Sequence, residues 1–279
     1  MVVLAIYEPG KKIPPASSKL TKLAPKDINK IVIEQPQQPN IILKRNKNGW
    51  EMLEPLHIPA NDILIDNLLS ITTSNSHSRY SVSKVELDQF NLNTPDLKIS
   101  FNDTTLAFGT TEPLGGSRYV LTNNEVHLIT DRYTHLIRGK MTALVSPKIL
   151  PGNAILTRLE LPDLTLQSSN DGWTASPDTN FKSSDQIQKL LDEWHYARAM
   201  QVKQDNILPA DSEKISAITI HTSNNGIYRF KLILQKDEII LYRSDMKLSY
   251  HFDKQTGERL LGHLTNESTP EETTPVKAK

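Results

Sequence analysis

Histidine and acidic side chains are the residues of this sequence best suited to chemistry, and they are widely scattered. The chain has 8 His and 0 Cys, which excludes disulfides, thiolate metal ligands and cysteine nucleophiles together. His127 and His135 lie eight positions apart with Asp131 between them, in the spacing that comes nearest to a metal-binding pattern. Ordinary surface or half-buried histidines remain the default interpretation of these residues.

A second candidate combines a carboxylate with an imidazole on one predicted helix. The run Asp192-Glu193-Trp194-His195 contains acidic groups and an imidazole that could serve as a general acid and base. Adjacent residues of a helix point apart, so these groups need partners from distant segments before they can act together. No serine stands in a Gly-x-Ser-x-Gly elbow, which leaves nucleophilic catalysis without a sequence signal.

The segment 108–118 is the glycine-bearing loop that most resembles a phosphate cradle. Such a cradle needs a lysine after its last glycine and the N-terminus of a helix behind it. Here the loop leads into a strand pattern and carries Glu112, which would repel phosphate, so a hairpin connection is favoured. We therefore predict no catalytic, cofactor-binding or metal-binding residues and no cofactor, and we expect that the protein is not an enzyme.

Two tryptophans follow tight turns in similar surroundings. Gly49-Trp50 comes after Asn48, and Gly172-Trp173 comes after Asp171, each between strand-like runs. Asn-Gly and Asp-Gly at such places predict hairpins with type I′ turns, in which both central residues have positive φ. Trp50 and Trp173 could be platforms for a glycan or peptide, but their recurrence favours a structural plug between hairpin and helix.

The order of elements predicts an α+β fold made of two tandem similar lobes, each an antiparallel sheet with a helix packed on one face. Each hairpin precedes an amphipathic helix, the first beginning at Asn61 and the second at Ser183 or Ser184. A further helix is predicted over 131–144. Both lobes then continue as a series of strands.

Subtraction of residue numbers supports an internal duplication. Trp173 lies 123 positions after Trp50, Leu190 lies 122 after Leu68, and Val202 lies 120 after Val82. The same comparison sets Lys236-Asp237 against Asn123-Asn124, at an offset of 113 for the following glutamates. The chain is accordingly divided into an apolar N-terminal remnant and linker (1–22), a first α+β repeat (23–152), a second repeat (153–263) and a disordered tail (264–279).

The start of the chain leaves two interpretations open. Residues 2–7 are apolar and lead into a polar linker, so they are either a first strand or disordered end, or part of a membrane anchor missing from this chain. The lysine-rich segment 11–30 could contact anionic headgroups, although a solvated linker is favoured. The formal net charge of +0 gives no reason to expect a nucleic-acid partner.

Several turn and core residues resemble a known bacterial family. They are Gly49-Trp50 followed by Pro55, then Leu87-Asp88 and Phe90-Asn91-Leu92 before Pro95, and then Phe108-Gly109 with Pro113 and Gly116 before Tyr119-Val120. Over about residues 31–161 the sequence is similar to the family named domain of unknown function 4340. The family commonly has glycine where this chain has Asn91, the residue that next best tolerates a left-handed conformation.

The resemblance implies a place and a role for the chain. Such proteins usually have an N-terminal membrane anchor and an extracytoplasmic α+β region, and are often encoded near parts of ABC transport systems of the gliding-motility type. We therefore expect a non-catalytic accessory or binding subunit on the extracytoplasmic face of the bacterial inner membrane, whose partners are transporter subunits. A glycan- or peptide-binding envelope module, or a hydrolase whose site cannot be read from sequence, are the alternatives.

Overall fold

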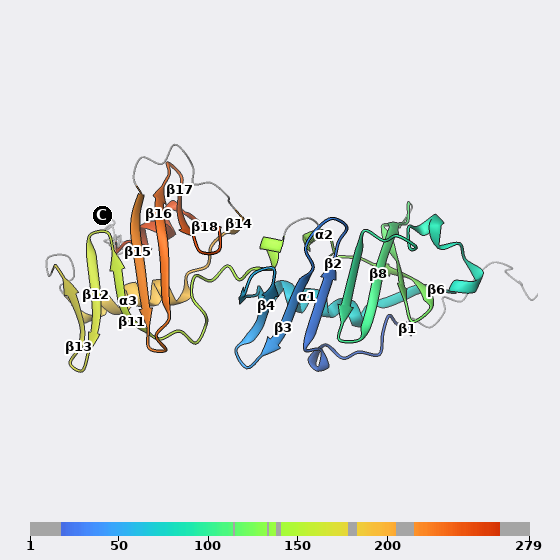
Figure 1. Cartoon of the computed structure of the whole chain (residues 1–279), viewed down its shortest axis with the longest axis horizontal. Helices are drawn as coiled ribbons and strands as arrows, with labels where there is room; N and C mark the ends of the chain where they lie inside the picture. Colours follow the sequence, from blue (N-terminus) through green and yellow to red (C-terminus); the bar gives the residue numbers. More distant parts are fainter. Residues whose placement is uncertain are drawn as a thin grey trace, which may run out of the picture. The chain divides into compact units, whose positions relative to one another are not determined.

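The computed structural model describes residues 18–113, 115–132, 134–137, 141–177, 183–204 and 215–262 (Figure 1). The segments 1–17 and 264–279, with most of the predicted linker and the predicted tail, lie outside the described residues. The chain divides into two compact units after Ser146. Each unit contains one large antiparallel sheet, so the fold is α+β with a predominance of strands.

The first unit has a ten-stranded sheet in the order β1-β6-β10-β9-β8-β7-β2-β3-β4-β5. The strands are β1 (Ser18–Lys19), β2 (Lys30–Glu34), β3 (Ile41–Asn46), β4 (Gly49–Glu54), β5 (Ile58–Pro59), β6 (Asn75–Ser81), β7 (Leu97–Phe101), β8 (Thr104–Thr111), β9 (Ser117–Thr122) and β10 (Glu125–Thr130). Short 3₁₀ turns connect them: η1 (Pro25–Asp27), η2 (Ile71–Thr73), η3 (Val82–Lys84), η4 (Leu87–Phe90) and η5 (Met141–Leu144).

The second unit has an eight-stranded sheet in the order β13-β12-β11-β15-β16-β17-β18-β14. Its strands are β11 (Leu156–Leu161), β12 (Leu164–Ser169), β13 (Gly172–Ser176), β14 (Gln201–Gln204), β15 (Ile215–Thr222), β16 (Ile227–Leu234), β17 (Glu238–Arg243) and β18 (Leu248–Asp253). When the two-residue strands β1 and β5 are left out, each sheet has eight strands, which can be matched one by one in the order in which they follow along the chain. The matched strands then lie in the same spatial order in the two sheets. The prediction of two tandem similar lobes is therefore confirmed.

The strand register also repeats, residue by residue, in the hairpin that carries each tryptophan. Trp50 pairs with Arg45 across β3 and β4, and Trp173 pairs with Ser168 across β12 and β13. Arg45 and Ser168 are separated by 123 positions, the same offset that separates the tryptophans. Each hairpin is followed by a cis peptide bond, at Glu54–Pro55 and at Ser176–Pro177.

Two of the matches made by subtraction are wrong. Lys236-Asp237 joins β16 to β17 and so corresponds to the β8–β9 connection, whereas Asn123-Asn124 joins β9 to β10. Val82 lies in η3, outside β6, and cannot match Val202 of β14. Turn residues and single valines recur too often along the chain to align the two halves. The pairing of strands within each sheet decides this alignment.

The two long helices form as their sequence signals predict. Asn61 accepts a hydrogen bond from the Leu64 N–H at the start of α1 (Asp62–Ser70), and Ser183 accepts one from the Gln186 N–H at the start of α3 (Ser184–Tyr196). Each helix lies across one face of its own sheet (Figure 1). The buried stripes of these helices are Leu64, Ile65, Leu68 and Leu69 in α1, and Ile187, Leu190, Leu191 and Trp194 in α3.

The structure corrects two predictions about helices. In place of the helix predicted over 131–144, the described residues form a single turn, α2 (Thr134–Ile137), and the 3₁₀ turn η5. A helix that the sequence pattern did not indicate, α4 (Lys254–Leu260), follows β18 and is capped by Asp253. It joins the second core because the Trp194 indole N–H donates to the Leu260 carbonyl at 2.8 Å.

The predicted type I′ turns are wrong at both tryptophan hairpins. Gly49 and Gly172 have φ of +117° and +113°, but Asn48 and Asp171 are not among the residues with positive φ. Asn46 Oδ1 instead accepts a hydrogen bond from the Asn48 N–H, which forms a local turn in which Asn48 has no positive φ. Positive φ at both central residues occurs at Asn123-Asn124, between β9 and β10.

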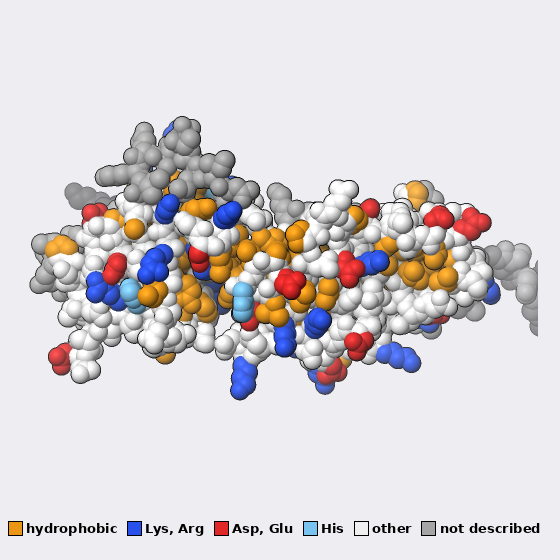
Figure 2. Space-filling model, in the orientation of Figure 1, with side chains coloured by type: hydrophobic (Ala, Val, Ile, Leu, Met, Phe, Trp, Pro, Cys, Tyr) orange, Lys and Arg blue, Asp and Glu red, His pale blue; other side chains and the backbone are white. Residues whose placement is uncertain are grey.

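Within the described residues, no helix has the length and apolar character needed to cross a bilayer. On the face that Figure 2 shows, acidic and basic side chains are interspersed over the strands, in keeping with the formal net charge of +0.

The 3₁₀ turn η4 approaches β8 very closely, and a glycine makes this approach sterically allowed. A Cβ on Gly109 would collide with the Phe90 carbonyl oxygen and lie 2.9 Å from Leu92 Cδ2. The turn ends at Asn91, whose φ of 54° confirms the expected left-handed conformation. Phe90 then packs on Tyr119 of β9 with ring centroids 4.2 Å apart.

We expect Gly109→Ala to lower the free energy of unfolding of the first unit by about 1–3 kcal/mol, because the added methyl group forces η4 away from β8. Chemical denaturation followed by circular dichroism measures the loss. Gly115→Ala is the matched control, since its nearest neighbour is the flexible end of Glu112. Equal stability of the two variants would contradict the role of Gly109.

Candidate functional site

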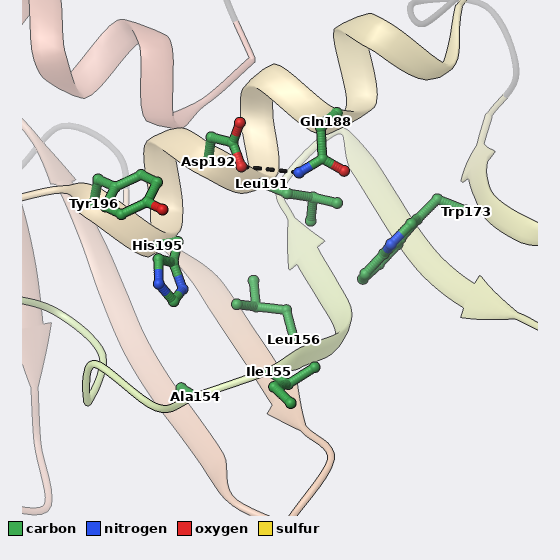
Figure 3. A pocket seen from close by; sticks show the side chains of 9 residues that line it. All are labelled: Ala154, Ile155, Leu156, Trp173, Gln188, Leu191, Asp192, His195 and Tyr196. Carbon is green, nitrogen blue, oxygen red and sulfur yellow. Dashed lines mark hydrogen bonds between the residues drawn. The ribbon is translucent and has the colours of Figure 1, made fainter. Parts of the chain in front are cut away.

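A surface pocket of ≈ 320 Å³ lies in the second unit, between helix α3, strand β13 and the segment that leads into β11 (Figure 3). Its volume is at the lower end of the range that ligand sites occupy. The residues that line it are Ala154, Ile155, Leu156, Trp173, Gln188, Leu191, Asp192, His195 and Tyr196.

One side of the pocket is apolar and the other can form hydrogen bonds. Ile155 and Leu156 project from the junction between the preceding segment and β11, and the half-buried ring of Trp173 faces the same space from β13 (Figure 3). Ile155 is 66% exposed, an unusual degree for so large an apolar side chain. A ligand with both an apolar surface and a polar group would match these two sides.

Helix α3 supplies the polar side, because residues four positions apart on a helix lie on the same face. Gln188 and Asp192 are four residues apart, and the Gln188 amide donates to Asp192 Oδ1 at 2.8 Å. Leu191 and His195 are also four apart and reach the same pocket. The structure thus brings Asp192 and His195 to one site, together with Trp173, although Asp192 holds Gln188 and His195 packs edge-on against Tyr196, with ring centroids 4.7 Å apart.

Charge is distributed unevenly along this helix. Glu193 faces away from the pocket and pairs with Arg259 of α4 at 3.1 Å. Asp192 is exposed, and no cationic side chain of the described residues forms an ion pair with it. Its carboxylate therefore presents negative charge and free acceptor positions at the pocket.

Trp50 has different surroundings from Trp173. It is 6% exposed, and its backbone N–H donates to Asp62 Oδ1 at 3.2 Å, which ties β4 to the first turn of α1. The guanidinium group of Arg45 lies over its ring, 4.9 Å from the centroid. Trp50 thus has no surface on which a ligand could stack.

The three residues considered for a metal site, His127, Asp131 and His135, are not brought together as ligands, and two of them are engaged in other contacts. Asp131 forms an ion pair with Arg118 at 2.6 Å and accepts hydrogen bonds from the N–H and hydroxyl of Thr134. His127 Nδ1 lies 3.0 Å from the Ser76 hydroxyl, whereas His135 is exposed on α2. Among the residues that the structure describes, no three His, Asp or Glu side chains converge as metal ligands would.

The glycine-bearing loop connects the antiparallel neighbours β8 and β9. The Glu112 N–H donates to the Ser117 carbonyl at 2.6 Å across this connection, and Gly116 has a φ of +65°. Arg118 Nη1 donates to the Gly109 carbonyl at 3.0 Å. The loop thus leads from one strand into the next, without the helix N-terminus of a phosphate cradle.

A chain of three side chains that the sequence did not indicate lies on β17 and β18. The Ser249 hydroxyl is 3.0 Å from His251 Nε2, and His251 Nδ1 is 3.0 Å from Glu238 Oε2. This is the atom order of a serine–histidine–glutamate triad. Ser249 is only 2% exposed and His251 5%, however, so an acyl substrate has no access to the hydroxyl. Alternation along β18 is the signal that could have found the Ser249–His251 pair.

We expect Ser249 to resist labelling by a fluorophosphonate probe in the folded protein, because its hydroxyl is buried. Mass spectrometry of the probe-treated full chain measures the adduct, with an active serine hydrolase in the same reaction as positive control. Labelling that Ser249→Ala abolishes would contradict this expectation and support the hydrolase alternative.

Burial lowers the pKa of His127 below its ordinary value of 6.5, and the neighbouring Arg79 lowers it further, while Glu125 partly opposes them. Between the lowered pKa and 6.5 the unfolded chain therefore binds more protons than the folded chain. The contribution of neutral His127 is complete above pH 6.5 and is lost as the pH falls below it.

We accordingly expect the free energy of unfolding to fall between pH 7.5 and 5.5, with His127 contributing at most about 1.4 kcal/mol per pH unit. In His127→Gln this part of the slope disappears, because the amide does not titrate. Urea denaturation at a series of pH values measures both slopes. An unchanged slope in the variant would show that His127 does not carry the effect.

Comparison with known proteins identifies the family of the chain. No curated relative and no solved structure matches it. The family model described as Domain of unknown function (DUF4340) matches residues 50–207, more than half of the chain and a span that includes Trp50, the whole second tryptophan hairpin and helix α3. The chain therefore belongs to the DUF4340 family.

Proposed function

We propose that this protein is a non-catalytic binding subunit of the bacterial cell envelope. It acts on the extracytoplasmic face of the inner membrane and contacts membrane subunits of an ABC-type transport system. The observation that carries the binding role is the pocket beside Trp173, with one apolar and one polar side. The transport context rests on the family resemblance alone.

The arrangement of the polar side chains supports binding over catalysis. Asp192 is oriented by Gln188, a contact that holds a carboxylate in place for a ligand. His195 is held against Tyr196 rather than against the acid. Such groups fix the orientation of a bound molecule, while Ile155 and Trp173 supply the contact area.

The exposed apolar side chains around the pocket support a protein partner. Tyr196 and Ile155 both line the pocket, and they are 70% and 66% exposed. Aromatic side chains are enriched in protein–protein interfaces, where they supply large contact areas. A partner that inserts one side chain into the pocket would also cover these residues.

Glycan binding is the second candidate, and Trp173 is the observation that favours it. A half-buried indole beside amide, carboxylate and imidazole groups offers an aromatic face and hydrogen-bonding partners to a sugar ring. A saccharide titration that changes the Trp173 signal would favour this candidate over a protein partner.

Site-specific photocrosslinking in native membranes tests the proposal. A photoreactive residue in place of Ile155 should crosslink to transporter membrane subunits, because this exposed side chain lines the pocket. The matched control replaces Ile227, which is 44% exposed on β16 of the same unit and does not line the pocket. Crosslinking that is absent at 155, or equal at the two positions, would overturn the proposed interaction.

A further inference from the structure

The two halves of the chain hold a tryptophan at the same place in the fold but give it different neighbours. Arg45 stands opposite Trp50 in the first hairpin, and Ser168 stands opposite Trp173 in the second. Cross-strand partners project from the same face of a sheet and contact each other. The residue opposite the tryptophan therefore decides what covers the indole ring.

In the first unit, Arg45 fills the space beside Trp50. Its guanidinium lies 4.9 Å from the ring centroid and donates to the carbonyls of Pro25 and Lys26 at 3.2 and 3.1 Å. These two residues belong to η1, in the segment that leads into β2. Arg45 thus connects the ring of Trp50 to the segment that precedes β2.

In the second unit the corresponding space is open. Ser168 is too short to reach across Trp173, and the segment that leads into β11 contributes Ala154, Ile155 and Leu156 to the pocket wall. The pocket therefore lies between the same two elements that Arg45 joins in the first unit. Its position suggests that a guanidinium group from another molecule fills it.

The charge and shape of the pocket agree with such an occupant. The Asp192 carboxylate accepts a hydrogen bond from a neutral amide and forms no ion pair with the cations of the described chain. A guanidinium is planar, stacks on an aromatic face and binds a carboxylate through two parallel N–H groups. Ile155 and Leu191 can contact the aliphatic part of the same side chain.

We propose that this pocket receives an arginine side chain of the partner protein, with the guanidinium between Trp173 and Asp192. The inference deepens the proposed binding function and rests on it. The first unit shows the contact of a guanidinium with the tryptophan ring within the chain, through Arg45 and Trp50, and the second unit forms this contact with a partner.

Titration of the full chain with N-acetylarginine amide tests this assignment. The chain has 3 Trp, so nitrogen–proton correlation spectra resolve the indole signal of Trp173, assigned with Trp173→Phe. We expect a saturable shift of that signal. N-acetylcitrulline amide, which has nearly the same shape without the charge, should bind at least about tenfold more weakly. Asp192→Asn should remove most of this difference. Equal binding of the two probes, or no shift with either, overturns the proposal.

An arginine placed within the chain gives a second test. Ser168→Arg should cover Trp173 as Arg45 covers Trp50, and should abolish binding of the arginine probe. Ser169→Arg is the matched control, because it adds the same charge at an exposed neighbour on the opposite face of β12. Retained binding in Ser168→Arg, in a variant whose spectrum shows an intact fold, contradicts the assignment.

The results separate this inference from the proposed function. Crosslinking to transporter subunits at position 155 without selective binding of the arginine probe would leave the binding role intact and overturn the arginine assignment. Selective binding of the probe without that crosslinking would support the assignment and overturn the proposed partner.

Discussion

The pairing of a tryptophan with the residue across its hairpin is the interaction on which the rest of the structure depends. Glycine at positive φ, Gly49 in one half and Gly172 in the other, ends each turn and sets this pairing. Because side chains alternate along a strand, a slip of one residue would move each tryptophan to the other face of its sheet. The common register fixes both the packing of the hairpin against its helix and the location of the pocket.

Local signals in the sequence were sufficient for the elements whose ends are chemically marked. Asn61 and Ser183 cap the two long helices as expected, since their side chains satisfy N–H groups of the first turn. Helix α4 was missed because Gly257 lies within it, and glycine disfavours helices. The glycine is required by packing, because a Cβ there would lie 2.5 Å from Ile239. The packing of Gly257 against Ile239 thus outweighs the low helix propensity of glycine. This contact joins residues far apart in the sequence, so a local sequence pattern cannot indicate it.

The candidate site could be predicted only in parts. Trp173, Asp192 and His195 all drew attention by residue type, but their convergence depends on how β13 and α3 pack together, which their separation in sequence does not reveal. Gln188 was missed, although its four-residue spacing from Asp192 is a readable signal. In the Ser249–His251–Glu238 chain the side chains do have the arrangement of a catalytic triad, but their burial keeps a substrate from reaching the hydroxyl.

The repeated topology gives the tryptophan of each hairpin a different environment, closed in the first unit and open in the second. In the first copy Arg45 satisfies the indole face and two backbone carbonyls, so Trp50 contributes to the core. In the second copy a serine keeps the strand register, which depends on backbone hydrogen bonds, and leaves the indole of Trp173 at a pocket. A shorter side chain opposite the tryptophan can therefore leave a pocket open without disturbing the sheet. The function of such a scaffold is determined by the contacts in which its copies differ, and not by the fold that they share.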